Sequence, residues 1–547
     1  MGVSICSSWK VCKGKANGSA GYPGTMALLP SLVWRFSDMA IGNLAPADHV
    51  RKPLDRDRYR LQHVAMDLDH DACYRAISLR DARFDGRLFT AVKTTGIYCR
   101  PICPARTPRS ENIIFFGTAA AAQEAGFRPC LRCRPETAPD LGAWRGTSNS
   151  VSRALALIEL GALDSGDVEA LAGRLGLGER QLRRLFRQHL GASPIAVAQT
   201  RRVLLAKQLI HETRLPMAEI AFASGFGSIR RFNETFLALF GRPPGDLRRR
   251  AGPDISAGSQ GEVSLRLRYQ PPYDWPAMLA FLSARAIAGI EHVEGQTYWR
   301  SIALDGVQGV LSVSPADGNA LAATIRFPRL SALPAIIARL RRVFDLAADP
   351  RAITAHLAED PALAPLVSAR PGLRVPGAWD GFELAMRAVL GQQITVAAAI
   401  RLAGRLVQAH GMPLAEPTGH LTHVFPTPDV LAVADLRTLG MPASRAATLS
   451  AVAAAVVADP DLFGATRELD EAVDRLRAIK GVGQWTAHYI ALRQLREPDA
   501  FPAADIGLMR AMADQDGRRP AANELMARAE RWRPWRAYAA QHLWASE

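Results

Sequence analysis

The chain has 547 residues, which at about 150 residues per domain predicts several domains rather than one core. Hydrophobic residues make up 48% and charged residues 22% of it, which excludes a disordered, collagen-like or acidic-tail protein. The net charge of +15 is unevenly distributed, because residues 1–250 contain 37 basic and 22 acidic residues and the remainder contains 30 of each. Clustered cations release counterions from phosphates, so the first part of the chain is expected to bind a polyanion such as nucleic acid.

The sequence contains no apolar stretch approaching the ~18 residues that span a bilayer. Residues 1–20 lack the apolar core of a signal peptide. We therefore expect a cytoplasmic, nucleoid-associated protein without a membrane partner. In that reducing compartment the seven cysteines are expected to be thiolates or metal ligands rather than to form disulfides.

The chain divides by composition into segments. Residues 1–65 show no steady periodicity and are expected to be a disordered extension, unless the assigned start codon is too early and Met66 is the native start. The remaining expected boundaries are 66–145 for a cysteine-rich module, 146–252 for an arginine-rich helical module, 253–262 for a linker, 263–375 for an α+β segment and 376–547 for a helical segment.

Four cysteines form two closely spaced pairs, Cys99/Cys103 and Cys130/Cys133. Two such pairs can close a tetrahedral site of four thiolates on one Zn²⁺; the alternative is accidental pairs in a reduced core. The flanks are basic, so that a negatively charged metal site would lie among cations that bind phosphate. These flanking residues are Lys93, Arg100, Arg106, Arg109, Arg128, Arg132 and Arg134.

The sequence around these cysteines resembles the N-terminal zinc domain of the Ada family. The matching segments are FDGRLFTAVKTTGIYCRPICPAR, NIIFF and AGFRPCLRCRPE. The resemblance implies that Cys99 irreversibly takes a methyl group from a DNA methylphosphotriester, while the other three cysteines complete the zinc site. It also implies phosphate contacts by Thr95, Arg106 and Arg128, although each arginine could equally be a solvated surface charge. Methylation would remove one negative charge from the DNA-facing site and thereby raise DNA affinity.

Residues 168–190 have the pattern of a helix, a glycine turn and a second helix, and the pattern recurs about 50 residues later. This duplication, with a connecting helix that begins near Pro194, resembles the DNA-binding domain of the AraC family. The second helix of each unit presents side chains that read base edges and phosphates; the alternative is two solvated basic helices. The predicted DNA-binding residues are Arg180, Arg183, Arg184, Arg230 and Arg231.

The segment AIKGVGQWTA, residues 478–487, has the pattern of a glycine hairpin between two helices. Gly481 and Gly483 would leave backbone N–H groups free for a DNA phosphate, although a glycine turn between packed helices looks similar. Asp505 directly precedes a new apolar helix, so that taken alone it is an attractive N-cap.

A helix-hairpin-helix followed by such an aspartate resembles the glycosylase superfamily that includes endonuclease III. The segments YQPPYDWPAMLAFLSARAI, RPGLRVPGAWDGFELAMRAVLGQQ, FPTPDVLA, LGMPASRA and AERWRPWRAYAAQHLW more specifically resemble the AlkA-type 3-methyladenine DNA glycosylases. The resemblance implies that Asp505 stabilises an oxocarbenium-like transition state and orients water. It further implies an aromatic pocket for a flipped base, with core packing as the alternative for each ring. The pocket residues are Phe281, Trp485, Tyr489 and Trp544.

Departures from related patterns refine these expectations. Trp485 stands where strand-cleaving members of the superfamily have lysine, so a monofunctional enzyme that leaves an abasic site is expected. No cysteine follows Cys133, so no iron-sulfur cluster is expected in this half. Gln393 stands where AlkA relatives often have an apolar wedge, and it is a candidate for insertion into DNA. The Pro-Cys-His-Arg motif of an alkylguanine transferase does not occur.

Together these observations predict a multidomain α+β protein. It would comprise a small four-cysteine zinc domain, an all-α tandem helix-turn-helix domain, an α+β glycosylase subdomain and an all-α helix-hairpin-helix core. We expect a monomer that excises N-alkylated purines, senses methylphosphotriesters and activates transcription, with double-stranded DNA and RNA polymerase as partners. The alternatives are a regulator whose glycosylase fold only binds damage, and an enzyme whose first modules only tether it to DNA.

Overall fold

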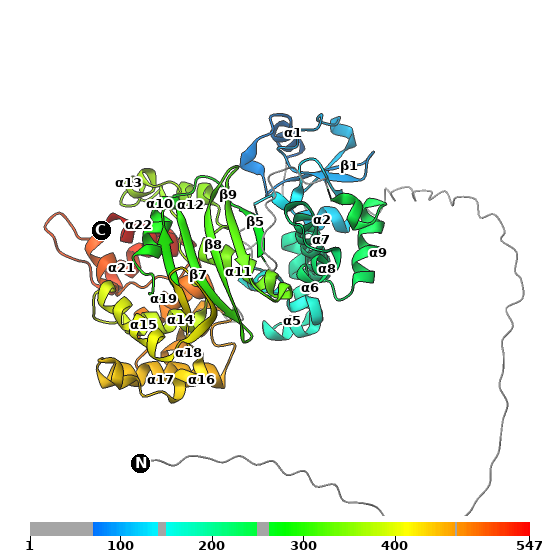
Figure 1. The fold of residues 1–547 in the computed structure, drawn as a ribbon. Coiled ribbons are helices and arrows are strands. Elements are labelled where there is room, and N and C mark those ends of the chain that lie inside the picture. Colours follow the sequence, from blue (N-terminus) through cyan, green and yellow to red (C-terminus); the bar gives the residue numbers. More distant parts are fainter. Residues whose placement is uncertain (1–68, 140–148, 249–261, 465–467) are drawn as a thin grey trace, which may run out of the picture. The chain divides into compact units, whose positions relative to one another are not determined.

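The structure, a computed structural model, describes residues 69–139, 149–248, 262–464 and 468–547 (Figure 1). The predicted extension at residues 1–65 and nearly all of the predicted linker at 253–262 lie outside these residues. Within the described residues no helix has the length and hydropathy needed to cross a membrane.

The cysteine-rich module is built on a four-stranded sheet in the order β3-β1-β2-β4. Its elements are α1 (His70–Ser78), β1 (Phe89–Val92), β2 (Ile97–Cys99), β3 (Ile113–Phe116), α2 (Ala119–Glu124) and β4 (Arg128–Pro129). Strands β2 and β4 are parallel, with Tyr98 opposite Pro129. Cys99 ends β2 and Cys130 follows β4 directly, so the parallel pairing brings the two cysteine pairs to the same edge of the sheet.

The arginine-rich module is entirely helical in the described residues, as predicted. Its helices are α3 (Asn149–Glu159), α4 (Ala162–Ser165), α5 (Val168–Arg174), α6 (Glu179–Leu190), α7 (Pro194–Glu212), α8 (Met217–Ala223) and α9 (Ile229–Phe240). Each second helix of the repeat ends at a glycine with φ +67°, Gly191 after α6 and Gly241 after α9, a conformation that favours glycine. The matching ends confirm the sequence duplication.

The α+β segment is an antiparallel five-stranded sheet in the order β5-β9-β8-β7-β6, with β5, β9, β8 and β7 side by side in Figure 1. Its elements are β5 (Glu262–Arg268), α10 (Trp275–Ser283), β6 (Glu291–Glu294), β7 (Thr297–Leu304), β8 (Val307–Ala316), β9 (Ala320–Arg326) and α11 (Leu333–Val343). The alternating patterns at residues 264–269 and 309–313 predict strands, and they fall largely on β5 and β8. Strand β7 was missed because its burial does not alternate: Arg300, Ser301 and Ile302 are all buried in succession.

The remainder is mostly helical, as expected from its 3.6-residue periodicity. The helices are α12 (Pro350–Leu357), α13 (Ala364–Ala369), α14 (Gly381–Leu390), α15 (Val396–His410), α16 (Pro428–Val433), α17 (Ala443–Ala458), α18 (Leu469–Arg477), α19 (Gln484–Ile490), α20 (Ile506–Ala511), α21 (Ala522–Ala529) and α22 (Arg536–Ser546). A two-stranded hairpin, β10 (Met412–Thr418) and β11 (Leu421–Val424), was not expected. Pro413 and Pro417 prevent helix there, and Gly419 turns the chain with φ +56°.

Three buried charged side chains and one half-buried one, Arg387, join the sheet to α14. Glu291 and Arg300 come from β6 and β7, and Glu383 and Arg387 come from α14. Arg300 donates to Glu291 at 3.0 Å and Arg387 donates to Glu383 at 2.7 Å, while Arg300 also pairs with Glu383 and Arg387 with Glu291. Removing one member would leave a buried charge uncompensated, at a cost of about 3–5 kcal/mol.

The predicted glycine hairpin lies between α18 and α19. Gly481 has φ +90°, and a Cβ at this position would overlap with Oγ1 of Thr448 on α17. Gly483 has an ordinary negative φ of −88° as N-cap of α19, and a Cβ there would meet no atom within 4 Å. Only the first of the two glycines is therefore demanded by the fold itself.

We expect Gly481→Ala to destabilise the glycosylase part by about 2–4 kcal/mol, because it combines backbone strain with a steric overlap. Gly483→Ala is the matched control and should cost less than about 1 kcal/mol, since only an N-cap preference is lost. Differential scanning calorimetry of the full chain measures both. Equal destabilisation by the two substitutions would contradict the hairpin geometry described here.

Candidate metal centre and candidate active site

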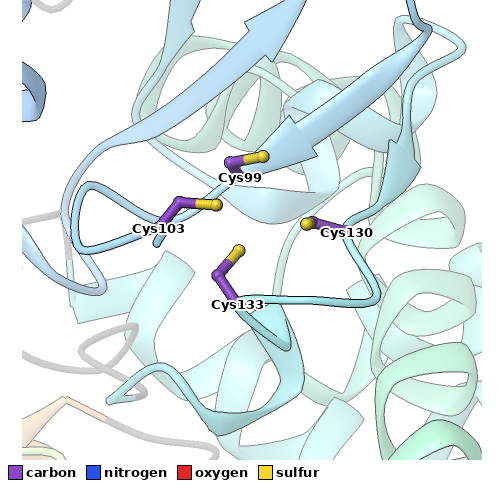
Figure 2. Close-up of side chains that lie close together, drawn as sticks. All are labelled: Cys99, Cys103, Cys130 and Cys133. Carbon is purple, nitrogen blue, oxygen red and sulfur yellow. The ribbon is translucent and has the colours of Figure 1, made fainter. Parts of the chain in front are cut away.

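The four predicted cysteine ligands converge. Their Sγ atoms all lie within 4.8 Å of one another, and Figure 2 shows the four side chains directed toward a common centre. A tetrahedral Zn²⁺ with Zn–S bonds of about 2.3 Å needs sulfurs roughly 3.8 Å apart. The cluster therefore fits one metal ion of this size with little adjustment.

The protonation of the four thiols also fits a metal site. Hydrogen bonding with Cys103, and then with Cys130 and Cys133, raises the pKa of Cys99 well above its ordinary value. Four thiols at this spacing cannot all ionise without a cation among them. A divalent ion would supply that cation and hold all four as thiolates.

Arg100 supports the cluster rather than facing DNA. Its guanidinium is buried in an ion pair with Asp85 and donates to the carbonyl oxygen of Cys133 at 3.3 Å and to Oγ1 of Thr137 at 2.6 Å. Its backbone N–H donates to Sγ of Cys133 at 3.3 Å. The prediction that Arg100 is one of the flanking cations that bind phosphate is therefore wrong. The sequence alone does not show that Asp85 packs against Arg100.

The predicted phosphate contacts lie around Cys99. Thr95, Arg106 and Arg128 line the same cavity of about 340 Å³ as the cysteine cluster. Thr95 and Arg106 are exposed and Arg128 is half-buried. The structure thus brings together the nucleophile candidate and three side chains that are able to bind a phosphate, although they come from separate segments of the chain.

The arginines predicted to read DNA lie on α6 and α9, the second helices of the two units. Arg180, Arg184 and Arg231 are exposed. Arg183 and Arg230 are also exposed but pair with Glu179 and Glu234 one helical turn away, at 2.5 and 2.8 Å respectively. To bind a phosphate or a base, each of these two arginines must first give up its ion pair with the glutamate on the same helix.

Asp505 is held by three donors. Its Oδ2 accepts from the indole Nε1 of Trp485 at 2.6 Å, and its Oδ1 accepts from Nε1 of Trp544 at 2.9 Å. The same Oδ1 accepts from the backbone N–H of Leu508 at 3.0 Å and so caps α20. The carboxylate of Asp505 therefore does two things at once. It caps α20, as the sequence suggested, and it lies beside the aromatic residues.

The four predicted pocket residues line one cavity of about 700 Å³, together with Asp505. Trp485 and Tyr489 are stacked, with ring centroids 5.2 Å apart and an angle of 13° between the planes, and Trp544 meets Tyr489 edge to face at 6.4 Å. Phe281 reaches the cavity from α10. Because these rings are half-buried, they border the cavity rather than fill a core.

Two arginines in this cavity were not predicted. Arg493 places its guanidinium carbon 4.5 Å from the ring centroid of Phe281, and Arg285 places its own 4.1 Å from the same centroid. A signal was present in the sequence: Arg285 follows Phe281 by four residues, and Arg493 follows Tyr489 by four residues. In an α-helix such spacing puts both members of a pair on one face, although Arg285 lies just beyond the end of α10 and Arg493 lies in a π-helical turn.

Gln393 lies at an exposed turn between α14 and α15 and has φ +57°, which is unusual for a residue other than glycine. Its neighbour Gln392 donates from Nε2 to the carbonyl oxygen of Gly481 and to Oγ1 of Thr486, both at 3.1 Å. The turn is thereby tied to the glycine hairpin.

Family models match the chain in four consecutive regions. They are the metal binding domain of Ada at residues 72–136, a helix-turn-helix domain at 171–250, the AlkA N-terminal domain at 264–380 and the HhH-GPD superfamily of base excision DNA repair proteins at 386–537. With the cysteine cluster and the Asp505 cavity, these matches define a base excision repair protein joined to a helix-turn-helix regulator.

Comparison with whole proteins identifies the family. The chain is 42% identical over 480 residues to the Mycobacterium tuberculosis protein named "Probable bifunctional transcriptional activator/DNA repair enzyme AlkA", covering 87% of this chain and 96% of that protein. The chain belongs to this family of bifunctional transcriptional activators and DNA repair enzymes. It is also 36% identical to Escherichia coli DNA-3-methyladenine glycosylase 2 (51% of this chain, 96% of that protein) and 38% identical to the E. coli bifunctional transcriptional activator/DNA repair enzyme Ada (24% and 35%).

We expect Arg100→Leu to weaken metal binding about 10- to 100-fold, because the carboxylate of Asp85 and the backbone around Cys133 lose their partner. Arg109→Leu is the control, since the side chain of Arg109 is 86% exposed and its loss should leave affinity unchanged. Competition with a chromophoric Zn²⁺ chelator measures both. Equal affinities of the two variants would show that Arg100 does not support the site.

Proposed function

We propose that the chain hydrolyses the N-glycosidic bond of N-alkylated purines such as 3-methyladenine and leaves an abasic site. The observation that carries this proposal is the carboxylate of Asp505, held by the two indole N–H groups of Trp485 and Trp544 at the edge of a cavity lined by aromatic rings. The E. coli relative named as a 3-methyladenine glycosylase supports the substrate class.

In this proposal a damaged nucleotide leaves the DNA stack and its base enters the cavity. The faces of Trp485 and Tyr489 stack on the base, and Asp505 lies next to the sugar. The carboxylate stabilises positive charge that develops at C1′ and orients water for attack on that carbon. Gly481 and Gly483 hold a DNA phosphate on their backbone N–H groups, and Gln393 fills the space that the base vacates.

We further propose that the cysteine cluster holds one Zn²⁺ and that the Cys99 thiolate takes a methyl group from a DNA methylphosphotriester. The metal keeps the sulfur deprotonated when bound, while Thr95, Arg106 and Arg128 bind the phosphate. Transfer makes Cys99 a thioether and removes one negative charge from the cluster. Reduced repulsion of phosphate then strengthens promoter binding by α6 and α9, and contact with RNA polymerase activates transcription.

The domain boundaries given above from the sequence belong to the same proposal, as do the monomeric state and the DNA-reading roles of Arg180, Arg183, Arg184, Arg230 and Arg231. The four matched regions support the order of the domains.

Asp505→Asn should lower the single-turnover release of 3-methyladenine from methylated duplex DNA by about 100-fold or more, because the charge is lost while the cap is kept. Asp274→Asn is the matched control, since Asp274 caps α10 in the same way by accepting from Ala277 N–H at 3.0 Å. Its activity should equal that of the wild type. Damage-specific binding without base release by the wild type would instead favour a regulator with a silent glycosylase fold.

Incubation with DNA that contains methylphosphotriesters should add one methyl group to the wild type and to Cys73→Ala, but none to Cys99→Ala. Cys73 is the control because it is buried in α1 outside the cluster. Intact-mass spectrometry measures the transfer. Promoter affinity of the methylated wild type should rise at least about fivefold. Unchanged affinity would favour the view that the first two modules only tether the enzyme.

A further inference from the structure

The C-terminal part of α6 is held by a carboxylate from the cysteine-rich module. Glu124, the last residue of α2, accepts from Nη1 and Nη2 of Arg187 on α6, at 2.7 and 2.9 Å. It also accepts from the backbone N–H and from Oγ of Ser193, the N-cap of α7, at 3.1 and 2.9 Å. Four donors fill the acceptor sites of one carboxylate. A bidentate pair with a guanidinium fixes direction as well as distance, so Glu124 sets the orientation of α2 against α6.

Nonpolar packing and a further hydrogen bond surround this carboxylate. Ala121 of α2 belongs to a buried cluster with Ala192, which lies between α6 and α7. A Cβ at Gly191, the glycine that ends α6, would come within 3.3 Å of the Cβ of Ala121. Thr118, the N-cap of α2, donates from Oγ1 to the carbonyl oxygen of Leu190 at 2.8 Å and so satisfies one of the last carbonyls of α6. The corner between α6 and α7 therefore packs closely against α2.

A second contact reaches the cysteine cluster itself. Lys207 of α7 is completely buried and donates from Nζ to the carbonyl oxygen of Cys130 at 2.9 Å and to Oε2 of Glu136 at 2.6 Å. Cys130 is one of the four candidate metal ligands, so α7 is bonded directly to the loop that would hold the metal. Each charge of a buried ion pair is costly without the other, which ties Lys207 and Glu136 together. The two modules are thus joined by two separate polar contacts.

These contacts affect which part of a DNA molecule the cysteine cluster can meet. Domains joined only by a chain segment generally move relative to one another, and the contacts of Glu124 and Lys207 oppose such movement. A phosphate contact carries no sequence information, so a freely tethered cluster would meet many phosphates along the DNA. A cluster held at a fixed distance from α6 meets one phosphate only, because a helix that reads bases binds its site in a single register.

We propose that the cysteine-rich module and the first helix-turn-helix unit bind one DNA duplex as a single rigid body, with Glu124 as the positioning residue. The charge of the cysteine cluster then acts on one defined phosphate of the bound duplex. This role of Glu124 rests on the proposed regulatory function and specifies its geometry. Methylation of Cys99 strengthens binding through that phosphate alone, so that a base sequence and one backbone position are recognised together.

The test removes the charge of one phosphate at a time. The probe is an undamaged duplex selected from a random-sequence pool by the Zn²⁺-loaded full chain. Each phosphate in turn is replaced by a neutral methylphosphonate, which has no methyl ester to transfer. For the unmethylated wild type, one replacement should raise affinity at least about fivefold, because repulsion by the four thiolates is lost there. Every other replacement should lower the affinity or leave it within about twofold.

Two variants loosen the docking. Glu124→Ala removes all four contacts of the carboxylate, and Glu124→Arg sets a second cation against Arg187. In both, no single replacement should raise affinity by more than about twofold, because the cluster then reaches several phosphates. Glu219→Ala is the matched control, since it removes an equal charge from an exposed position on α8 and should keep the response of the wild type. Methyl transfer to Cys99 should proceed at the wild-type rate in all three variants.

Hydrogen exchange followed by mass spectrometry should show faster exchange in α2 of both Glu124 variants and unchanged exchange in β1 and β2, which separates undocking from unfolding. Exchange in α2 as slow as in the wild type, or a single-position gain that persists in Glu124→Arg, would overturn the inference. Gains at many positions of the wild type, or at none while methylation of Cys99 still strengthens binding, would overturn it and leave the proposed switch standing. If neither a replacement nor methylation strengthens binding, both fail.

Discussion

The largely buried network of Glu291, Arg300, Glu383 and Arg387 is the interaction on which the glycosylase half depends. The cavity has walls from two sources, because Phe281 belongs to the α+β segment whereas Trp485 and Trp544 belong to the helical one. Two carboxylates and two guanidiniums compensate one another only when the sheet and α14 are in register. The network therefore specifies how the two walls meet. Nonpolar packing alone would allow a wider range of arrangements of the sheet and α14.

The chain's two chemistries share a principle although their sites differ. At the cysteine cluster a metal ion would hold all four sulfurs as thiolates, and at Asp505 a carboxylate is positioned by neutral donors. In both cases the group that we propose to react is held by interactions that do not cancel its nucleophilic or electrostatic character. The proposed regulatory step follows from the first site, because methylation changes the charge of a group that the fold already supports.

Much of this organisation could be predicted from the sequence because its signals are local. The two cysteine pairs, the duplicated helix-turn-helix and the helix that follows Asp505 depend on spacing within a few turns of chain. The role of Arg100 could not be predicted, since its partner Asp85 is distant in sequence and an arginine beside cysteines looks like a surface charge. Arg493 was missed for the related reason that a cation is not expected among rings that would bind a cationic base. The β10–β11 hairpin was hidden by the alanine-rich helices around it.

The two indole N–H groups that donate to Asp505 also affect how this enzyme could evolve toward a different reaction. One oxygen of the carboxylate accepts from Trp485, the position at which strand-cleaving relatives are expected to carry lysine. A lysine there would remove a cavity wall and set an ammonium against the carboxylate in the same step. A change from hydrolysis to amine-based chemistry would thus require the base-binding surface and the electrostatics of the sugar site to be rebuilt together, which makes a gradual path between the two reactions difficult.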